Sequence, residues 1–299
     1  MRSVMHLARD LSPAFAYAHK HGLHALVIAR GDDVAAQEYG DGFEGTGPHP
    51  LYSGTKSFWG VAALYACADG LMALDEPVGE TVAAWRDDPW KRRVTLRMLL
   101  SLTAGFGFGG IGASVPTYDR ALALALRDEP GTRFSYGGIP LQVFGAVLAR
   151  KLASRRLTPH EYLRERVLDR AQVRVASWRK LADGTNPLPT GAFLAARDWL
   201  AYGRFVASQR STLTPCFEGS AANARYGLGW WLGAPGAPSD LVYASGSAGQ
   251  ALYVVPSLDV TIVHFGKSSS YRHDAFLKRV FEQANVGGSP SVTGIVAAR

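Results

Sequence analysis

Short apolar runs gather near the two ends of the chain, where glycine, proline and aspartate separate them. Runs of this length with turn residues between them are typical of antiparallel strands. The N-terminal runs, 24–30 and 34–39, flank Gly31-Asp32-Asp33 and predict a hairpin. Further strands are expected at 240–244, 250–255 and 260–265, after a strand-like aromatic stretch at 226–232. If the two groups join, they form one antiparallel sheet of about five strands.

The middle of the chain instead places apolar residues at helical spacing, three and four positions apart. Helices are also expected at both ends, where they would flank the sheet. The expected helices cover residues 1–20, 53–70, 95–102, 117–129, 139–151, 159–168, 195–207 and 271–284. The predicted fold class is α+β, an antiparallel sheet of N- and C-terminal strands flanked by helices, with an inserted helical lobe.

The stretch Ser53-Gly54-Thr55-Lys56 directly precedes the longest of these apolar runs, 58–67. Ser53 is therefore expected on the first turn of a buried helix, where backbone N–H groups lack partners and the helix dipole is positive. Lys56 follows on the same helix face, and burial there would lower the pKa of its amine. A hydroxyl, a low-pKa amine and N–H donors together are what an acyl-transfer nucleophile needs.

The same spacing occurs a second time, in Ser177-Trp178-Arg179-Lys180, so the motif alone does not identify a site. This copy lies in a polar, Arg-rich stretch without an apolar helix behind it. A capping serine and a solvated lysine are the more common meaning of one such motif. The buried helix therefore favours Ser53 over Ser177.

The composition excludes several classes of function. With 47% hydrophobic residues, a chain of 299 can bury a core, and its net charge is +7. The basic residues are scattered, with short clusters only at 91–93 and 155–156, so we expect no nucleic-acid surface. No apolar run reaches ~18 residues, so no membrane span is expected. The first residues lack the apolar core of a signal peptide, so the default expectation is cytoplasmic, and a periplasmic or secreted location would require an export signal.

Metal ligands are not grouped in the sequence. Cys67 and Cys216 lie far apart and form neither a disulfide framework nor a metal motif. His19, His21 and His24 are close together, but no carboxylate or cysteine accompanies them at a ligand spacing. A polar helix end explains them better than a metal site. We expect neither a metal nor another cofactor.

Two further stretches could contribute to a site. The glycine-rich segment 103–112 follows no strand and precedes no Gly-Lys-Ser, so a loop facing the substrate is favoured over a phosphate loop. Tyr136 lies on a glycine-flanked turn just before the helix expected at 139–151. Its hydroxyl would be held by the backbone there, although a packing tyrosine is the common alternative.

Four features now follow one another along the chain: Ser53-x-x-Lys56, Tyr136 after 131–135, paired aromatics in 226–231, and the strand entry 244–250. As an ordered set they resemble the serine β-lactamase and penicillin-binding-protein superfamily, most closely its class C-like branch of esterases, D-peptidases and amide hydrolases. The likeness covers roughly residues 20–285. It implies a β-lactamase/transpeptidase-like fold and a single catalytic domain over 1–299. The implied parts are an α/β lobe at 1–52 and 222–285, a mainly helical lobe at 53–221 and a loose tail at 286–299.

The resemblance also implies roles for individual residues. Ser53 would be the nucleophile, and Tyr136 the general base, kept partly ionised by Lys56. Lys56 would relay a proton and titrate together with Tyr136 as a coupled pair. The backbone N–H groups of Ser53 and Ser247 would form the oxyanion hole. Substrate contacts are expected from Gly138, Ser245, Gly246 and Trp230.

This chain departs from the superfamily at two positions. Gly138 stands where the usual Tyr-x-Asn motif carries its asparagine, and Ala244 stands where Lys, His or Trp opens the third motif. Without that amide and that cation we expect weak or no β-lactamase activity, and a small-molecule ester or amide as the substrate. Two alternatives stay open: an acyltransferase that uses the same acyl-enzyme, and a non-catalytic acyl-binding or sensor protein.

Overall fold

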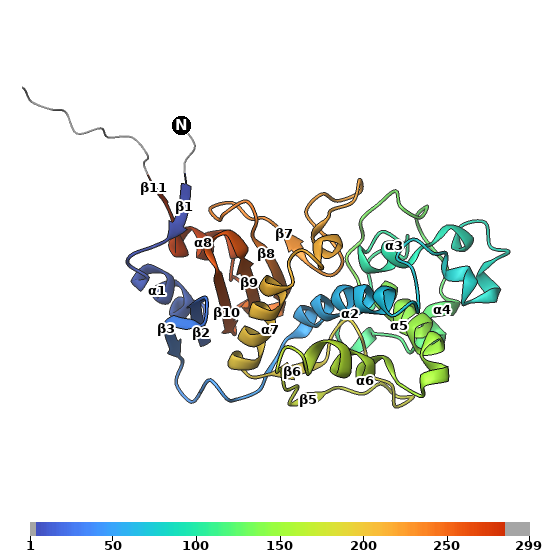
Figure 1. The fold of residues 1–299 in the computed structure, drawn as a ribbon, viewed down its shortest axis with the longest axis horizontal. Coiled ribbons are helices and arrows are strands. Elements are labelled where there is room, and N and C mark those ends of the chain that lie inside the picture. The colour runs from blue at the N-terminus through green and yellow to red at the C-terminus, as the bar shows by residue number, and fades with distance from the viewer. Residues whose placement is uncertain (1–3, 285–299) are drawn as a thin grey trace, which may run out of the picture.

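A six-stranded antiparallel sheet forms one side of the protein, whose computed structural model describes residues 4–284 (Figure 1). The N-terminal hairpin supplies two strands, and the C-terminal part of the chain supplies the other four. The spatial order is β3 (Asp33–Tyr39), β2 (Leu23–Arg30), β10 (Val260–Gly266), β9 (Gln250–Val255), β8 (Val242–Gly246) and β7 (Trp231–Leu232). The predicted joining of the two groups is confirmed, because β10 pairs directly with β2.

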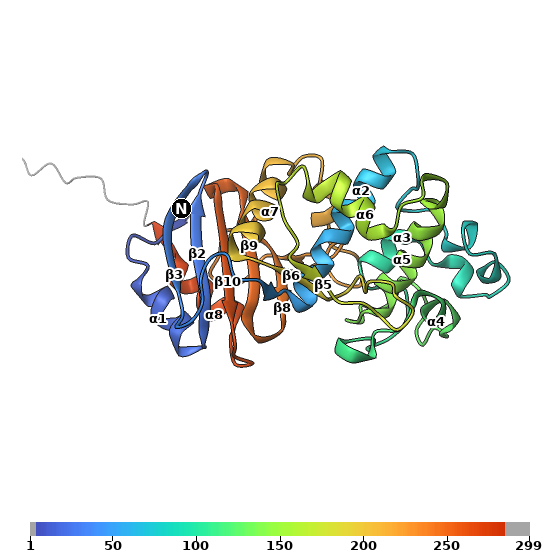
Figure 2. The ribbon, with the colours of Figure 1, turned by 90° about the horizontal axis from the view of Figure 1, so that it is seen from below.

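The sheet separates two hydrophobic cores, because alternate side chains of a strand point to opposite faces. Leu26 of β2 packs with α1 (Ser12–Lys20) and α8 (His273–Val280), whereas its neighbour Val27 joins the core that contains α7 (Ala196–Ser208). Figure 2 shows α7 on the side of the sheet that faces the remaining helices. Helices α1 and α8 lie within the ranges 1–20 and 271–284 that the sequence predicts as helical, although each is shorter than predicted.

A helical lobe lies beside the sheet, and α2 runs from the boundary into its interior (Figures 1 and 2). The lobe contains α2 (Ser57–Ala68), α3 (Leu96–Leu100), α4 (Tyr118–Ala123), α5 (Ile139–Lys151) and α6 (Pro159–Leu163). Most residues of α2 are buried, as its uniformly apolar sequence predicts. The predicted α+β fold class is confirmed.

A small three-stranded sheet, which the sequence did not indicate, lies near the boundary between the lobes. Its strands are β4 (His49–Pro50), β6 (Ala192–Leu194) and β5 (Ser177–Trp178). The second Ser-x-x-Lys copy therefore begins in a strand and not on a helix. This local structure separates it from Ser53.

Two helix predictions are wrong at the chain ends. Residues Val4–Leu7 form strand β1, and Phe281–Ala284 form β11, which pairs with it. Each strand is short, and its partner lies at the other end of the sequence, so local periodicity carries no signal of the pairing. Residues 1–3 and the tail expected at 286–299 lie outside the described residues.

Other boundaries differ less. Helix α5 has the expected bounds, α4 is shorter than the expected 117–129, and only the last two residues of 226–232 form a strand. Within residues 4–284, no helix combines the length and apolar character that crossing a membrane requires.

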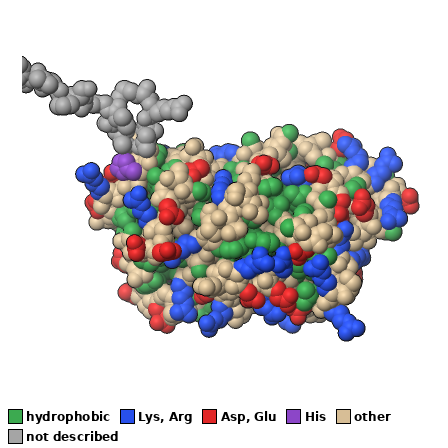
Figure 3. All heavy atoms as spheres, viewed as in Figure 1, with side chains coloured by type: hydrophobic (Ala, Val, Ile, Leu, Met, Phe, Trp, Pro, Cys, Tyr) green, Lys and Arg blue, Asp and Glu red, His purple; other side chains and the backbone are tan. Residues whose placement is uncertain are grey.

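Charged side chains of both signs are interspersed over the face that Figure 3 shows. Ion pairs in the protein include Arg97 with Asp75 and Arg166 with Asp69. On this face the basic residues form no broad area of a single sign, in agreement with their scatter along the sequence.

Candidate active site

Ser53 lies in a 3₁₀ turn, Tyr52–Lys56, that leads directly into α2. The residue before it, Tyr52, has a φ of 46°, a conformation that bulky residues rarely adopt. The residue after it, Gly54, packs so closely on Trp199 that a Cβ atom would lie 2.9 Å from the indole ring. Strained backbone and tight packing thus fix the serine, an arrangement that is common at functional sites.

The amine of Lys56 is held against this serine. Only 2% of Lys56 is exposed, and its Nζ donates to Ser53 Oγ at 2.9 Å and to the carbonyl oxygen of Pro189 at 3.2 Å. Burial lowers the pKa of Lys56 to about 7, because the dry surroundings disfavour the ammonium form. Near neutral pH much of the amine is therefore unprotonated and able to accept a proton from Ser53.

Tyr136 completes the group expected from the sequence. Its ring centroid lies 4.9 Å from Lys56 Nζ, and its ring stacks on Trp231 at 5.8 Å between centroids. Burial raises the pKa of Tyr136, and its hydrogen bond with the Ser53 side chain acts in the opposite direction. Because burial dominates, the neutral phenol is favoured. The partly ionised Tyr136 implied by the resemblance would have to overcome this effect of burial, and its role as base stays a prediction.

A cavity of about 60 Å³ opens on Ser53 and Lys56, and Tyr136 is not among the residues that line it. Ser53, Lys56, Ser247 and Thr190 line it, together with the loop segment 110–112. The loop is held by a hydrogen bond from the Gly138 N–H to the Gly109 carbonyl at 2.9 Å. The glycine-rich segment 103–112 thus contributes to the wall of the cavity, as a loop facing the substrate should.

Strand β8 approaches the turn that carries Ser53 from the other lobe. A Cβ atom on Gly246 would lie 2.1 Å from the Leu51 carbonyl oxygen, so only glycine allows this approach. Ser247 follows in the turn Ser247–Gly249 and lines the cavity with Ser53. The two residues proposed as oxyanion donors therefore border one space, although they come from different lobes.

Three residues expected to contact the substrate have other surroundings. Trp230 is fully buried and donates from Nε1 to the Ser57 carbonyl at 3.1 Å, so it supports the first turn of α2 and does not line the cavity. Gly138 is buried beneath the loop, where a Cβ atom would lie 2.1 Å from the Gly110 carbonyl oxygen. Ser245 directs its hydroxyl to His273 at 2.9 Å. None of the three lines the cavity, so their contact with a substrate stays a prediction.

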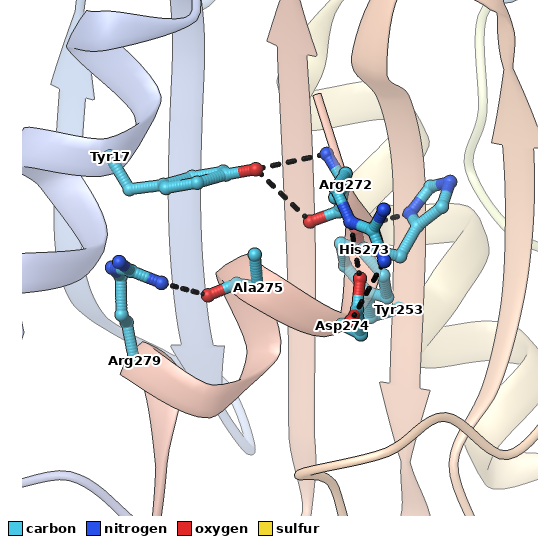
Figure 4. A network of polar contacts seen from close by, with 7 residues as sticks. All are labelled: Tyr17, Tyr253, Arg272, His273, Asp274, Ala275 and Arg279. Atoms are coloured by element: carbon cyan, nitrogen blue, oxygen red, sulfur yellow. Dashed lines mark hydrogen bonds and ion pairs between the residues drawn. The ribbon is translucent and has the colours of Figure 1, made fainter. Parts of the chain in front are cut away.

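The partner of Ser245 belongs to a buried polar network that the sequence did not indicate. His273 Nδ1 shares a hydrogen bond with the Tyr253 hydroxyl at 2.6 Å, and Tyr253 contacts the Tyr271 hydroxyl at 3.0 Å. Burial lowers the pKa of His273 to about 4, so the neutral ring can donate from one nitrogen and accept at the other. Figure 4 shows His273 with Tyr253, and beside them Tyr17 bonded to the backbone of Arg272.

The histidines near the N-terminus separate in the structure. His19 pairs with Glu38, His21 contacts the Tyr17 carbonyl, and His24 contacts His49. In the described part of the chain, no group of three or more His, Cys, Asp or Glu residues is arranged to hold a metal ion.

Comparisons with known proteins bear on this geometry. The family model described as Beta-lactamase matches residues 13–280 of the chain. No curated protein matches it. The class C beta lactamase from Rhodobacter sphaeroides is similar in structure, with a TM-score of 0.68 at 16% identity over 91% of this chain and 97% of that one.

Two other solved structures of similar fold are described with other activities. The D-stereospecific amidohydrolase from Streptomyces sp. has a TM-score of 0.70 at 15% identity, over 90% of this chain and 98% of that one. EstCE1, described as a hydrolase with promiscuous acyltransferase activity, has a TM-score of 0.72 at 15% identity. The match covers 90% of this chain and 97% of EstCE1. At such identities the likeness shows the fold, and it confirms the expected β-lactamase/transpeptidase-like architecture.

Proposed function

The chain belongs to the beta-lactamase family, and from this premise we propose that it is a serine hydrolase that forms an acyl-enzyme on Ser53. The observation that carries the proposal is the 2.9 Å contact between Lys56 Nζ and Ser53 Oγ. Both groups line one cavity, and Ser247 lines the same space from the opposite lobe. Nucleophile, base and backbone donors around one cavity are the parts that acyl transfer requires.

The first step transfers the acyl group to the serine. Neutral Lys56 takes the Ser53 proton as Oγ attacks the carbonyl carbon of an ester or amide, and the carbonyl electrons move onto oxygen. The N–H groups of Ser53 and Ser247 stabilise this oxyanion, and each lowers the activation barrier by ~3–4 kcal/mol. The intermediate then expels the alcohol or amine, which leaves with the proton that Lys56 took up.

The second step releases the acid. Water attacks the acyl-enzyme, gives its proton to Lys56, and expels the serine oxygen, which is reprotonated. We assign to neutral Tyr136 the relay of this proton between Lys56 and the reacting oxygen. The assignment replaces the tyrosinate base expected from the sequence, because burial raises the pKa of Tyr136 and lowers that of Lys56.

Esters and small amides are the proposed substrates, in preference to β-lactams. Gly138 offers no side-chain amide and its N–H already donates to Gly109. Ala244 is 1% exposed and carries no charge for a lactam carboxylate. The activities described for the similar amidohydrolase and for EstCE1 support this range of substrates.

Acyl transfer to an alcohol or amine is a second candidate, because water and another nucleophile compete for the same acyl-enzyme. The acyltransferase activity described for EstCE1, a protein of similar fold, supports this second candidate. A non-catalytic sensor is less favoured, since an apolar residue in place of Lys56 would avoid the burial of an amine.

A panel of p-nitrophenyl esters, anilides and penicillins tests the proposal, each with and without added alcohol. We expect ester turnover by the wild type, loss in Ser53→Ala, and no loss in Ser211→Ala, which removes an exposed serine. Ester turnover that persists in Ser53→Ala would contradict the proposal. Product diverted to the alkyl ester would indicate acyl transfer.

A further inference from the structure

A second, larger cavity adjoins the catalytic one. It measures about 410 Å³, against about 60 Å³ for the space at Ser53. Tyr52, Gly112 and Thr190 line both cavities, so the two lie side by side. We call the larger one the side groove, and Trp178, Arg179 and Phe193 also line it.

The side groove has the character of a chain-binding site. Aromatic and aliphatic side chains form most of its wall. Tyr52, which lines both cavities, is 42% exposed, and Ile111, which lines the catalytic cavity, is 37% exposed. Apolar side chains grouped around an opening are typical of a ligand site. A substrate with an extended chain could place its carbonyl at Ser53 and the chain in this groove.

Arg179 is the one charged residue of the side groove. Within residues 4–284, its Nε and Nη2 atoms are buried and have no hydrogen-bond partner. Its backbone is fixed, since its N–H donates to Gly191 at 2.9 Å and its carbonyl accepts from Asn186 at 2.9 Å. Buried donors of this kind are rare in proteins, and each specific case requires an explanation.

Two other arginines of this protein show which group the Nε and Nη2 atoms of a guanidinium bind. Arg97 uses Nε and Nη2 to hold both carboxylate oxygens of Asp75, at 2.7 and 2.8 Å. Arg166 binds Asp69 through the same two atoms. A parallel pair of N–H donors matches a carboxylate, and Arg179 carries the same pair next to the site without such a partner.

We propose, resting on the proposed function, that the side groove binds an apolar chain ending in a carboxylate, which Arg179 recognises. The substrate class is an ester or amide with a terminal acid on its acyl or its leaving-group chain. Protein atoms cover Nε and Nη2, so the end of the side chain must turn into the groove to meet the carboxylate. Arg179 would thus replace the cation missing at Ala244, from a different element of the fold.

Matched esters test the proposal. The p-nitrophenyl monoesters of glutaric, adipic and suberic acid are compared with the pentanoate, hexanoate and octanoate, which have the same chain lengths without the acid. A second series carries the acid on the alcohol side of an acetate ester. We expect wild-type kcat/KM to favour the acid over the neutral ester at one chain length, and the series that responds identifies the chain involved.

Arg179→Met then removes the guanidinium and keeps an apolar stem. We expect kcat/KM for the acid ester to fall roughly 10- to 100-fold, and that for the neutral ester to change less than about twofold. Lys180→Met, which removes an exposed neighbouring charge, should change neither. A wild type without preference for the acid at any chain length contradicts the proposal, as does equal loss on both esters in a folded Arg179→Met.

A binding measurement separates this inference from the proposed function. In Ser53→Ala, calorimetry with adipic acid monohexylamide should detect binding that Arg179→Met abolishes. If no ester is turned over but this binding is found, the hydrolase proposal fails and the side groove stands. If esters are turned over and no binding is found, the side-groove proposal fails alone.

Discussion

Replacement of Lys56 by methionine should change the pH dependence of stability in a defined way. Burial lowers the pKa of folded Lys56 from 10.5 to about 7. Between these values the unfolded chain binds more protons than the folded one, so wild-type stability rises with pH. The linkage relation gives a penalty of about 4 kcal/mol at pH 7, which falls to about 2 kcal/mol at pH 9.

Lys56→Met removes this penalty but leaves the Pro189 carbonyl without its donor, a loss of about 1–3 kcal/mol that does not depend on pH. We therefore expect the variant to be more stable than the wild type at pH 7, and the difference to shrink by about 2 kcal/mol at pH 9. The measurement is chemical denaturation followed by circular dichroism at pH 7, 8 and 9.

Lys180→Met is the matched control, because Lys180 holds the same place in the second Ser-x-x-Lys copy and is exposed. The difference between its free energy of unfolding and that of the wild type should be the same at each pH. If the Lys56→Met curve also runs parallel, Lys56 titrates normally and the reasoning is refuted. The same pKa predicts that the rate of wild-type ester hydrolysis rises about tenfold between pH 6 and pH 8, with a midpoint near 7.

Three further substitutions follow from the geometry. Gly246→Ala places a Cβ atom 2.1 Å from the Leu51 carbonyl oxygen, so kcat should fall at least tenfold while circular dichroism reports a folded protein; unchanged kcat would contradict the close approach. Trp230→Phe removes the donor to the Ser57 carbonyl and should lower the free energy of unfolding by about 1–3 kcal/mol, which denaturation measures; no loss would mean that this bond does not support α2. His273→Ala should destabilise by a similar amount and leave the pH–rate midpoint near 7 unchanged, whereas a shifted midpoint would show coupling to the catalytic base.

Several features of the candidate site could be predicted from the sequence. The apolar run after Ser53 predicted a buried helix, and burial of that helix accounts for the low pKa of Lys56. The order of the motifs along the chain predicts that Tyr136 and Gly246 lie near the same serine. The helix could be predicted because it depends on residue type and spacing within one element, whereas Tyr136 and Gly246 were placed by the resemblance that the ordered motifs carry.

Contacts made by backbone atoms could not be predicted. The Pro189 carbonyl accepts from Lys56, and every residue type carries such a carbonyl. Trp230 was assigned to the substrate because its neighbours form a motif, yet the direction of its side chain depends on packing against α2. Strands β1 and β11 likewise depend on each other across the whole chain. Information of this kind lies in tertiary contacts and not in local pattern.

The acyl-enzyme itself can be observed most directly by intact mass after reaction with a fluorophosphonate, followed by peptide mapping. We predict one adduct per chain, located on the peptide that contains Ser53, absent from Ser53→Ala and retained in Lys180→Met. An adduct of equal yield in Ser53→Ala, or one mapped to another serine, would contradict acyl transfer through Ser53.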